Sequence, residues 1–165
     1  MATVIRGDDN FDTADRGVAI ANQWRLTTNL SGDNIVTNWE QADDATSANI
    51  GAAMSLSSGV FSFPVLGLYQ IHCNARFTNA ANDNVKIQLQ ASTDGGSSWD
   101  LVGETSAGSG SSYEKTSSTT AFVNVVNSSI KVRLHTGSMG SGSNLSGNTN
   151  ENLTSVTFIK LGASQ

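Results

Sequence analysis

The chain has 165 residues, enough for one domain with a full hydrophobic core that needs no disulfides or metals as staples. Its formal net charge is −5 at pH 7 and it has no run of Lys or Arg, so nucleic acids and anionic membranes are not expected as partners. A single cysteine excludes an intrachain disulfide. Charged residues make up only 14%, while Gly, Ser, Thr and Asn are abundant, which favours many short strands joined by polar turns.

The N-terminal part, residues 1–23, contains acidic and polar clusters without sustained alternation. We expect it to be an arm that attaches the subunit to a neighbour, followed by one folded domain over residues 24–165. No basic segment leads into an apolar stretch, so neither a secretion signal nor a membrane span is expected. Only residues 14–24 could carry a short helix.

Alternation of apolar and polar residues predicts strands in the rest of the chain. The clearest alternation covers residues 69–77, and the next clearest covers residues 85–91. Polar stretches at 106–112 and 136–152 are expected to be loops. The predicted strands are residues 24–30, 34–39, 60–63, 69–77, 85–91, 101–102, 119–126, 130–134 and 155–161. About eight to ten strands with turns between them favour an all-β, two-sheet antiparallel jelly-roll sandwich with an N-terminal arm.

Residues 92–99 match the Asp-box pattern S-x-D-x-G-x-[ST]-W once, through Ser92, Asp94, Gly96 and Trp99. In propeller enzymes this box is itself a structural turn, in which Asp and Ser bond to the backbone and Trp packs beneath. A propeller would need several copies and a longer chain. We therefore interpret these residues as a stabilised hairpin turn.

The sequence offers no constellation for catalysis or for zinc binding. His72 and His135 both occupy outward positions on predicted strands, without Cys or carboxylate at ligand spacing. Cys73 shares an inward face with Ile71 and Ala75, so it should be a small buried hydrophobe. We expect no catalytic residues, no cofactor and no metal. A loose calcium site among Asp8, Asp9, Asp12, Asp43 and Asp44 remains an alternative to solvated loop carboxylates.

Residues 59–71 carry the most specific signal. This segment matches the pattern G-x-F-x-x-P-x-x-G-x-Y-x-I through Gly59, Phe61, Pro64, Gly67, Tyr69 and Ile71. This resembles the signature of the complement-q and tumour-necrosis-factor jelly-roll superfamily, in which it marks a short strand, a turn and the following strand. The order of the later predicted strands is also similar to that of this family.

The resemblance implies a homotrimer, because in this superfamily one sheet of each subunit packs around a threefold axis through apolar and aromatic side chains. Tyr69, Phe122 and Phe158 are aromatic strand residues that could reach such an axis. The alternative is that they fill the core of the sandwich.

The missing secretion signal, collagen-like stalk and disulfide, together with the Asn, Ser and Gly content, look like a bacteriophage virion protein assembled in the host cytoplasm. The expected function is that of a trimeric capsid decoration or cement subunit that binds the major capsid protein or another virion protein. The alternative is a receptor-binding or glycan-binding tip of a fibre, with a host-surface glycan as partner. The loops 106–112 and 136–152 would then make the contacts.

Overall fold

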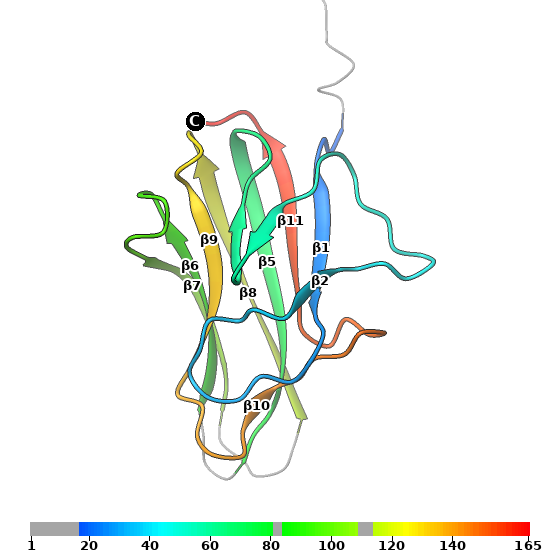
Figure 1. Cartoon of the computed structure of the whole chain (residues 1–165), viewed down its shortest axis with the longest axis vertical. Helices are drawn as coiled ribbons and strands as arrows, with labels where there is room; N and C mark the ends of the chain where they lie inside the picture. Colours follow the sequence, from blue (N-terminus) through cyan, green and yellow to red (C-terminus); the bar gives the residue numbers. More distant parts are fainter. Residues whose placement is uncertain (1–16, 81–83, 109–113) are drawn as a thin grey trace, which may run out of the picture.

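The computed structural model describes residues 17–80, 84–108 and 114–165. These residues form eleven strands and no helix, and therefore contain no helix that could cross a membrane. The strands make two antiparallel sheets packed face to face (Figure 1). This confirms the predicted all-β jelly-roll sandwich, with one strand more than the upper end of the expected range.

Sheet A has the strand order β8, β5, β11, β1, β2, with the two-residue β10 continuing the β11 side of β5. Its members are β1 (Ala21–Leu26), β2 (Trp39–Gln41), β5 (Gly67–Thr78), β8 (Glu114–Val125), β10 (Asn144–Leu145) and β11 (Ser155–Gly162).

Sheet B has the order β3, β4, β9, β6, β7. Its members are β3 (Ser55–Ser57), β4 (Val60–Ser62), β6 (Val85–Ser92), β7 (Asp100–Ala107) and β9 (Lys131–Gly137). The chain between β1 and β2 crosses from sheet A to the edge of β9, where Ile35 bridges to His135 (Figure 1).

The core lies between the two sheets and is centred on aromatic side chains. The ring centroid of Phe61, on β4, lies 5.4 Å from the ring centroid of Trp24, 6.1 Å from that of Trp39 and 5.0 Å from that of Phe158. Phe61 and Phe158 have no exposed surface, and both tryptophans pack against the core. Edge-to-face and tilted contacts at these distances add to the hydrophobic stabilisation. Trp39 is therefore a core residue, and the partly buried Trp24 packs against the core.

The signature segment forms the predicted strand, turn and strand. Ser58 and Gly59 have φ of 49° and 80° and make the two-residue turn between β3 and β4, a geometry that favours Gly. A Cβ at Gly59 would lie 2.6 Å from the carbonyl oxygen of Val36, so only glycine fits. The hydroxyl of Tyr69 donates to the carbonyl of Val65 at 2.9 Å and closes the turn before β5. The signature is thus a packing motif of the fold.

Several predicted boundaries were wrong. Strand β1 begins at Ala21, inside the segment expected to be an arm. The strand expected over residues 34–39 is not formed, apart from Trp39, where β2 begins. The helix considered for residues 14–24 is not formed in its described part, because residues 21–24 pair with β11. Strand β8 starts at Glu114 instead of residue 119. Strands β3 and β10 were not predicted, since two or three residues are too short to show alternation.

Candidate assembly surface

The outer face of sheet A is the surface on which the predicted assembly function depends. Along β5 the odd-numbered residues from Gly67 to Phe77 are buried, and the even-numbered residues point outward and are half-buried. The next strand along the edge, β8, is in register with β5 over its whole length. Two long paired strands therefore present one continuous outer surface.

Phe122 of β8 stands out on this surface. Its neighbours Ala121 and Val123 are buried, whereas Phe122 is 65% exposed, the largest exposed fraction of any aromatic side chain in the described residues. Register places Phe122 opposite Gln70 of β5, and Gln70 in turn opposite the half-buried Ile159 of β11. Phe122 lies on the edge strand β8, close to the end of that strand. A single exposed aromatic residue does not by itself mark an interface, so its apolar neighbours decide what this surface can do.

Other exposed apolar side chains lie at the same end of the sandwich as Phe122. Val125 at the end of β8 pairs with Gly67 at the start of β5, and Gly162 at the end of β11 pairs with Leu68. The turn before β5 and the ends of β8 and β11 therefore meet there. We call this group the apolar end; its exposed members are Val65, Leu66, Phe122, Val126 and Leu161.

The next row of the outer face is polar and internally hydrogen-bonded. Nδ1 of His72 lies 2.9 Å from Oγ1 of Thr120, and Nε2 of Gln23 donates to Oγ1 of Thr157 at 3.2 Å. Register places these four side chains in one line across β8, β5, β11 and β1. The outer face of sheet A thus has exposed apolar side chains at one end and a hydrogen-bonded polar row beside them.

The structure separates the three aromatic residues that were considered for a threefold axis. Tyr69 and Phe158 have no exposed surface. Both side chains point between the sheets, Tyr69 stacking on Phe63 at 4.7 Å and Phe158 on Phe61. A fully enclosed side chain cannot touch a neighbouring subunit, so Tyr69 and Phe158 follow the alternative that the sequence left open and fill the core. Of the three, only Phe122 is available for contact.

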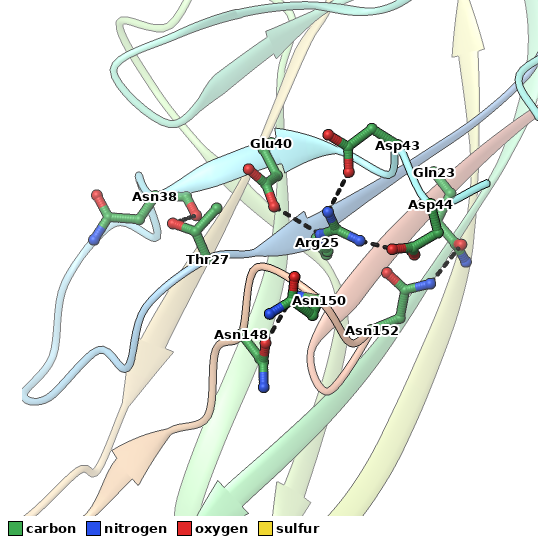
Figure 2. A network of polar contacts seen from close by, with 10 residues as sticks. All are labelled: Gln23, Arg25, Thr27, Asn38, Glu40, Asp43, Asp44, Asn148, Asn150 and Asn152. Atoms are coloured by element: carbon green, nitrogen blue, oxygen red, sulfur yellow. Dashed lines mark hydrogen bonds and ion pairs between the residues drawn. The ribbon is translucent and has the colours of Figure 1, made fainter. Parts of the chain in front are cut away.

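A buried arginine fixes the opposite border of sheet A (Figure 2). The side chain of Arg25 on β1 is only 3% exposed. Its Nε lies 2.7 Å from Oε1 of Glu40, its Nη1 lies 2.8 Å from Oδ2 of Asp44, and its Nη2 contacts Asp43. The hydrogen bond that Arg25 donates to Glu40 is the largest of several influences that raise the pKa of Arg25, while burial opposes them. Asp43 and Asp44 are therefore ion-pair partners of Arg25, and Asp8, Asp9 and Asp12 lie outside the described residues.

The structure places Ser92, Asp94, Gly96 and Trp99 in one turn between β6 and β7. Oδ1 of Asp94 accepts hydrogen bonds from the backbone N–H groups of Ser97 and Ser98, both at 2.9 Å. Oγ of Ser92 accepts from the N–H of Gly96 at 2.8 Å. Nε1 of Trp99 donates to the carbonyl of Gly96 at 3.0 Å. Each polar group of the motif is thus bonded within the turn.

The turn predicts a specific dependence of stability on pH. Hydrogen bonds from the Ser98 hydroxyl and backbone, and then from Ser92, lower the pKa of Asp94. A lowered pKa stabilises the fold above the carboxyl's unfolded value, about 4, and this contribution is lost as the pH falls. In Asp94→Asn we expect a lower melting temperature at pH 7 but a flatter decline below about pH 4. Thermal melts from pH 7 to pH 2 measure this, with Asp100→Asn, outside the turn, as control. Parallel curves for Asp94→Asn and the wild type would contradict the assigned role.

The remaining chemistry-bearing residues are dispersed. His72 lies on the outer face of sheet A, and His135 lies on sheet B. Cys73 is enclosed between the sheets, and burial raises the pKa of its thiol to about 12. Within residues 17–80, 84–108 and 114–165, no group of three His, Cys, Asp or Glu side chains is placed to hold a metal ion.

Comparison with solved structures identifies the fold. A crystal structure of murine APRIL at pH 5.0 superposes with a TM-score of 0.67 and 10% sequence identity, covering 86% of this chain and 98% of that one. The Eiger TNF from S. frugiperda superposes with a TM-score of 0.63 and 13% identity, covering 90% and 96%. No protein-family model and no curated protein matches the sequence. The chain therefore has a tumour-necrosis-factor-like jelly-roll fold.

Proposed function

We propose that this chain is a non-enzymatic assembly module that forms a homotrimer through the outer face of sheet A. We further propose that the trimer is a decoration or cement subunit of a bacteriophage head. The observation that carries the assembly role is the apolar end, where an aromatic side chain 65% exposed lies among other exposed aliphatic residues. Clustered apolar surface of this kind marks interaction sites, whereas single exposed apolar residues do not.

The number of subunits rests on the resemblance of residues 59–71 to the superfamily signature and on the tumour-necrosis-factor-like fold. In a threefold assembly each subunit uses two different surface patches, so the contact is heterologous and closes into a ring. The outer face of sheet A offers such a pair. The apolar end extends over the end of β8, the start of β5 and the end of β11, and the Arg25 network lies beside the opposite border, at β2.

A structural role fits the distribution of reactive groups better than catalysis does. General acid–base or nucleophilic chemistry needs two or more such groups within hydrogen-bond reach. Here His72 and His135 lie in different sheets, and Cys73 is enclosed in the core. Asp94 is committed to the bonds of its own turn.

The placement on a virion is supported by the sequence alone. The chain is acidic, has one cysteine and is rich in Gly, and its first residues form a polar segment ahead of a single jelly roll. A particle-bound decoration subunit needs one surface for its own trimer and another for the capsid. We assign the first to sheet A and the second to the N-terminal segment.

Two measurements on the full chain test this proposal. Light scattering after gel filtration should give the mass of three chains. Removal of residues 1–12 should leave that mass unchanged but abolish binding to phage heads that lack the protein, because the arm would provide the attachment. Retained binding by the shortened chain would exclude the arm as attachment site. A one-chain mass for the full protein would exclude the trimer.

A further inference from the structure

The outer face of sheet B, opposite the proposed assembly face, carries a row of basic residues. Lys131, Arg133 and His135 alternate along β9 with the buried Val132 and Leu134. Residues at i and i+2 on a strand point to the same side and lie about 7 Å apart. Three basic side chains thus follow one another on one face of a protein whose net charge is −5.

Arg133 is held in a fixed orientation without an anion. Its guanidinium lies over the ring of Trp99, 4.2 Å from the ring centroid, and its Nε donates to Oε1 of Gln90 at 2.8 Å. Burial lowers the pKa of the Arg133 guanidinium, as expected where no carboxylate offsets the loss of water. Among the ion pairs of the described residues, none involves Arg133.

A chain of amides fixes the partner of Arg133. Nε2 of Gln90 donates to Oε1 of Gln88 at 3.1 Å, and Nε2 of Gln88 donates to Oε2 of Glu104 at 2.9 Å. Glu104 is also paired with Lys86 at 3.1 Å. Glu104, the only carboxylate in this chain of hydrogen bonds, therefore pairs with Lys86 and Gln88 and does not contact Arg133. Gln90 is oriented to accept from Nε of Arg133, which leaves the terminal Nη groups of the guanidinium for another acceptor.

Lys131 extends the same surface. Its Nζ donates to Oγ of Ser62 at 2.7 Å, and no ion pair of the described residues involves it. A guanidinium that is held over an aromatic ring and bonded at Nε is positioned to bind a carboxylate through its two Nη groups. The neighbouring ammonium adds a second positive charge. The Arg133 guanidinium and the Lys131 ammonium together could bind one compact anionic group, such as a carboxylate.

The other end of the row opens into a depression of about 530 Å³. His135 contributes to its wall, and the segment between β1 and β2 forms the rest through Leu30, Asp33, Asn34, Ile35 and Thr37. These side chains combine hydrogen-bond acceptors, donors and apolar surface. Such a mixture suits the hydroxyl groups and the ring face of a sugar.

We propose that the outer face of sheet B binds an acidic saccharide, with the carboxylate of one sugar on Arg133 and Lys131 and a neighbouring sugar in the depression beside His135. A nucleic acid fits less well, because phosphate-driven binding needs many cations and the net charge opposes it. An acidic peptide would not use the hydroxyl-binding groups of the depression. The inference does not depend on the trimer, since sheets A and B face opposite ways.

The probes are short oligomers of galacturonic acid, of glucuronic acid and of sialic acid. The methyl ester of the galacturonic acid oligomer is the uncharged control, because it has the same sugar backbone without the carboxylate charge. Titration calorimetry on the full chain should show binding of at least one acid form and at least tenfold weaker binding of the ester. Arg133→Gln should weaken binding at least tenfold, and Arg133→Lys should weaken it several-fold because the bidentate geometry is lost.

Arg76→Gln is the matched control, because Arg76 is also a strand arginine but lies on sheet A. It should bind like the wild type, and thermal melts will show that each variant is folded. No binding of any acid oligomer would overturn the proposal. Equal binding of the ester, equal loss in Arg76→Gln, or equally tight binding of polyglutamate would also overturn it.

Discussion

Replacing Phe122 with Asp is expected to convert the proposed trimer into single chains. Phe122 is 65% exposed, so covering the exposed part of its side chain contributes about 1–2 kcal/mol, and three copies contribute about 3–6 kcal/mol to the assembly. That range corresponds to about two to four powers of ten in the assembly constant. A carboxylate at this position would in addition have to be desolvated at the contact. The effect on assembly should therefore exceed that of any other single surface change on sheet A.

The same substitution should leave the subunit itself folded. Phe122 is 65% exposed, so its side chain contributes little to the core, and surface substitutions usually change stability by less than about 0.5 kcal/mol. Light scattering gives the mass, and circular dichroism with thermal melting reports the fold. A three-chain mass at micromolar concentration would show that the contact does not involve Phe122.

Thr116→Asp is the matched control for this experiment. Thr116 is exposed on the same strand and the same face as Phe122, six residues away and therefore about 20 Å toward the other end. Both variants add one negative charge to β8. If Thr116→Asp dissociates the trimer equally, the cause is net charge and the apolar end is not the contact.

Sequence alone was sufficient for the layers of the fold but not for the roles of its aromatic residues. Residues 69–77 alternate so regularly that the inward position of Cys73 could be predicted, and by the same parity Tyr69 had to point inward. The alternation of β5 therefore excludes Tyr69 from contacts on the outer face of sheet A. Around Phe122 apolar and β-branched residues occupy both faces of the strand, so the sequence pattern does not predict which face is buried. Only the pairing of β8 with β5 shows that Phe122 faces outward.

The two polar networks could not be derived from sequence for a different reason. The carboxylates that contact Arg25 are 15–19 residues away in the chain, and their meeting depends on the register of β1 with β2. The stacking of Arg133 on Trp99 depends on the pairing of β9 with β6 and on the turn after β6. Register between strands distant in sequence is set by the whole core. By contrast, the turn of residues 92–99 was predictable, because its bonds are local.

Replacing Arg25 with Met should destabilise the fold by about 2–3 kcal/mol. Removing one partner of a fully buried pair costs about 3–5 kcal/mol. Here Arg25 is enclosed, but the side chains of Glu40, Asp43 and Asp44 are 34%, 76% and 39% exposed, so solvent screening reduces the loss. Without the guanidinium these three carboxylates also repel one another. Chemical denaturation of the wild type and the variant at neutral pH measures the difference.

Arg76→Met tests whether the loss comes from burial of the cation. Arg76 also contacts a carboxylate, that of Glu114, but the two side chains are 29% and 59% exposed, and such pairs contribute only about 0–1 kcal/mol. Added salt should narrow the gap between Arg25→Met and the wild type, because it screens the repulsion of the remaining carboxylates. Equal losses in the two variants would mean that Arg25 acts as an ordinary surface pair. A larger loss at Arg25 that shrinks with salt would establish it as the residue that fixes the β2 border of sheet A.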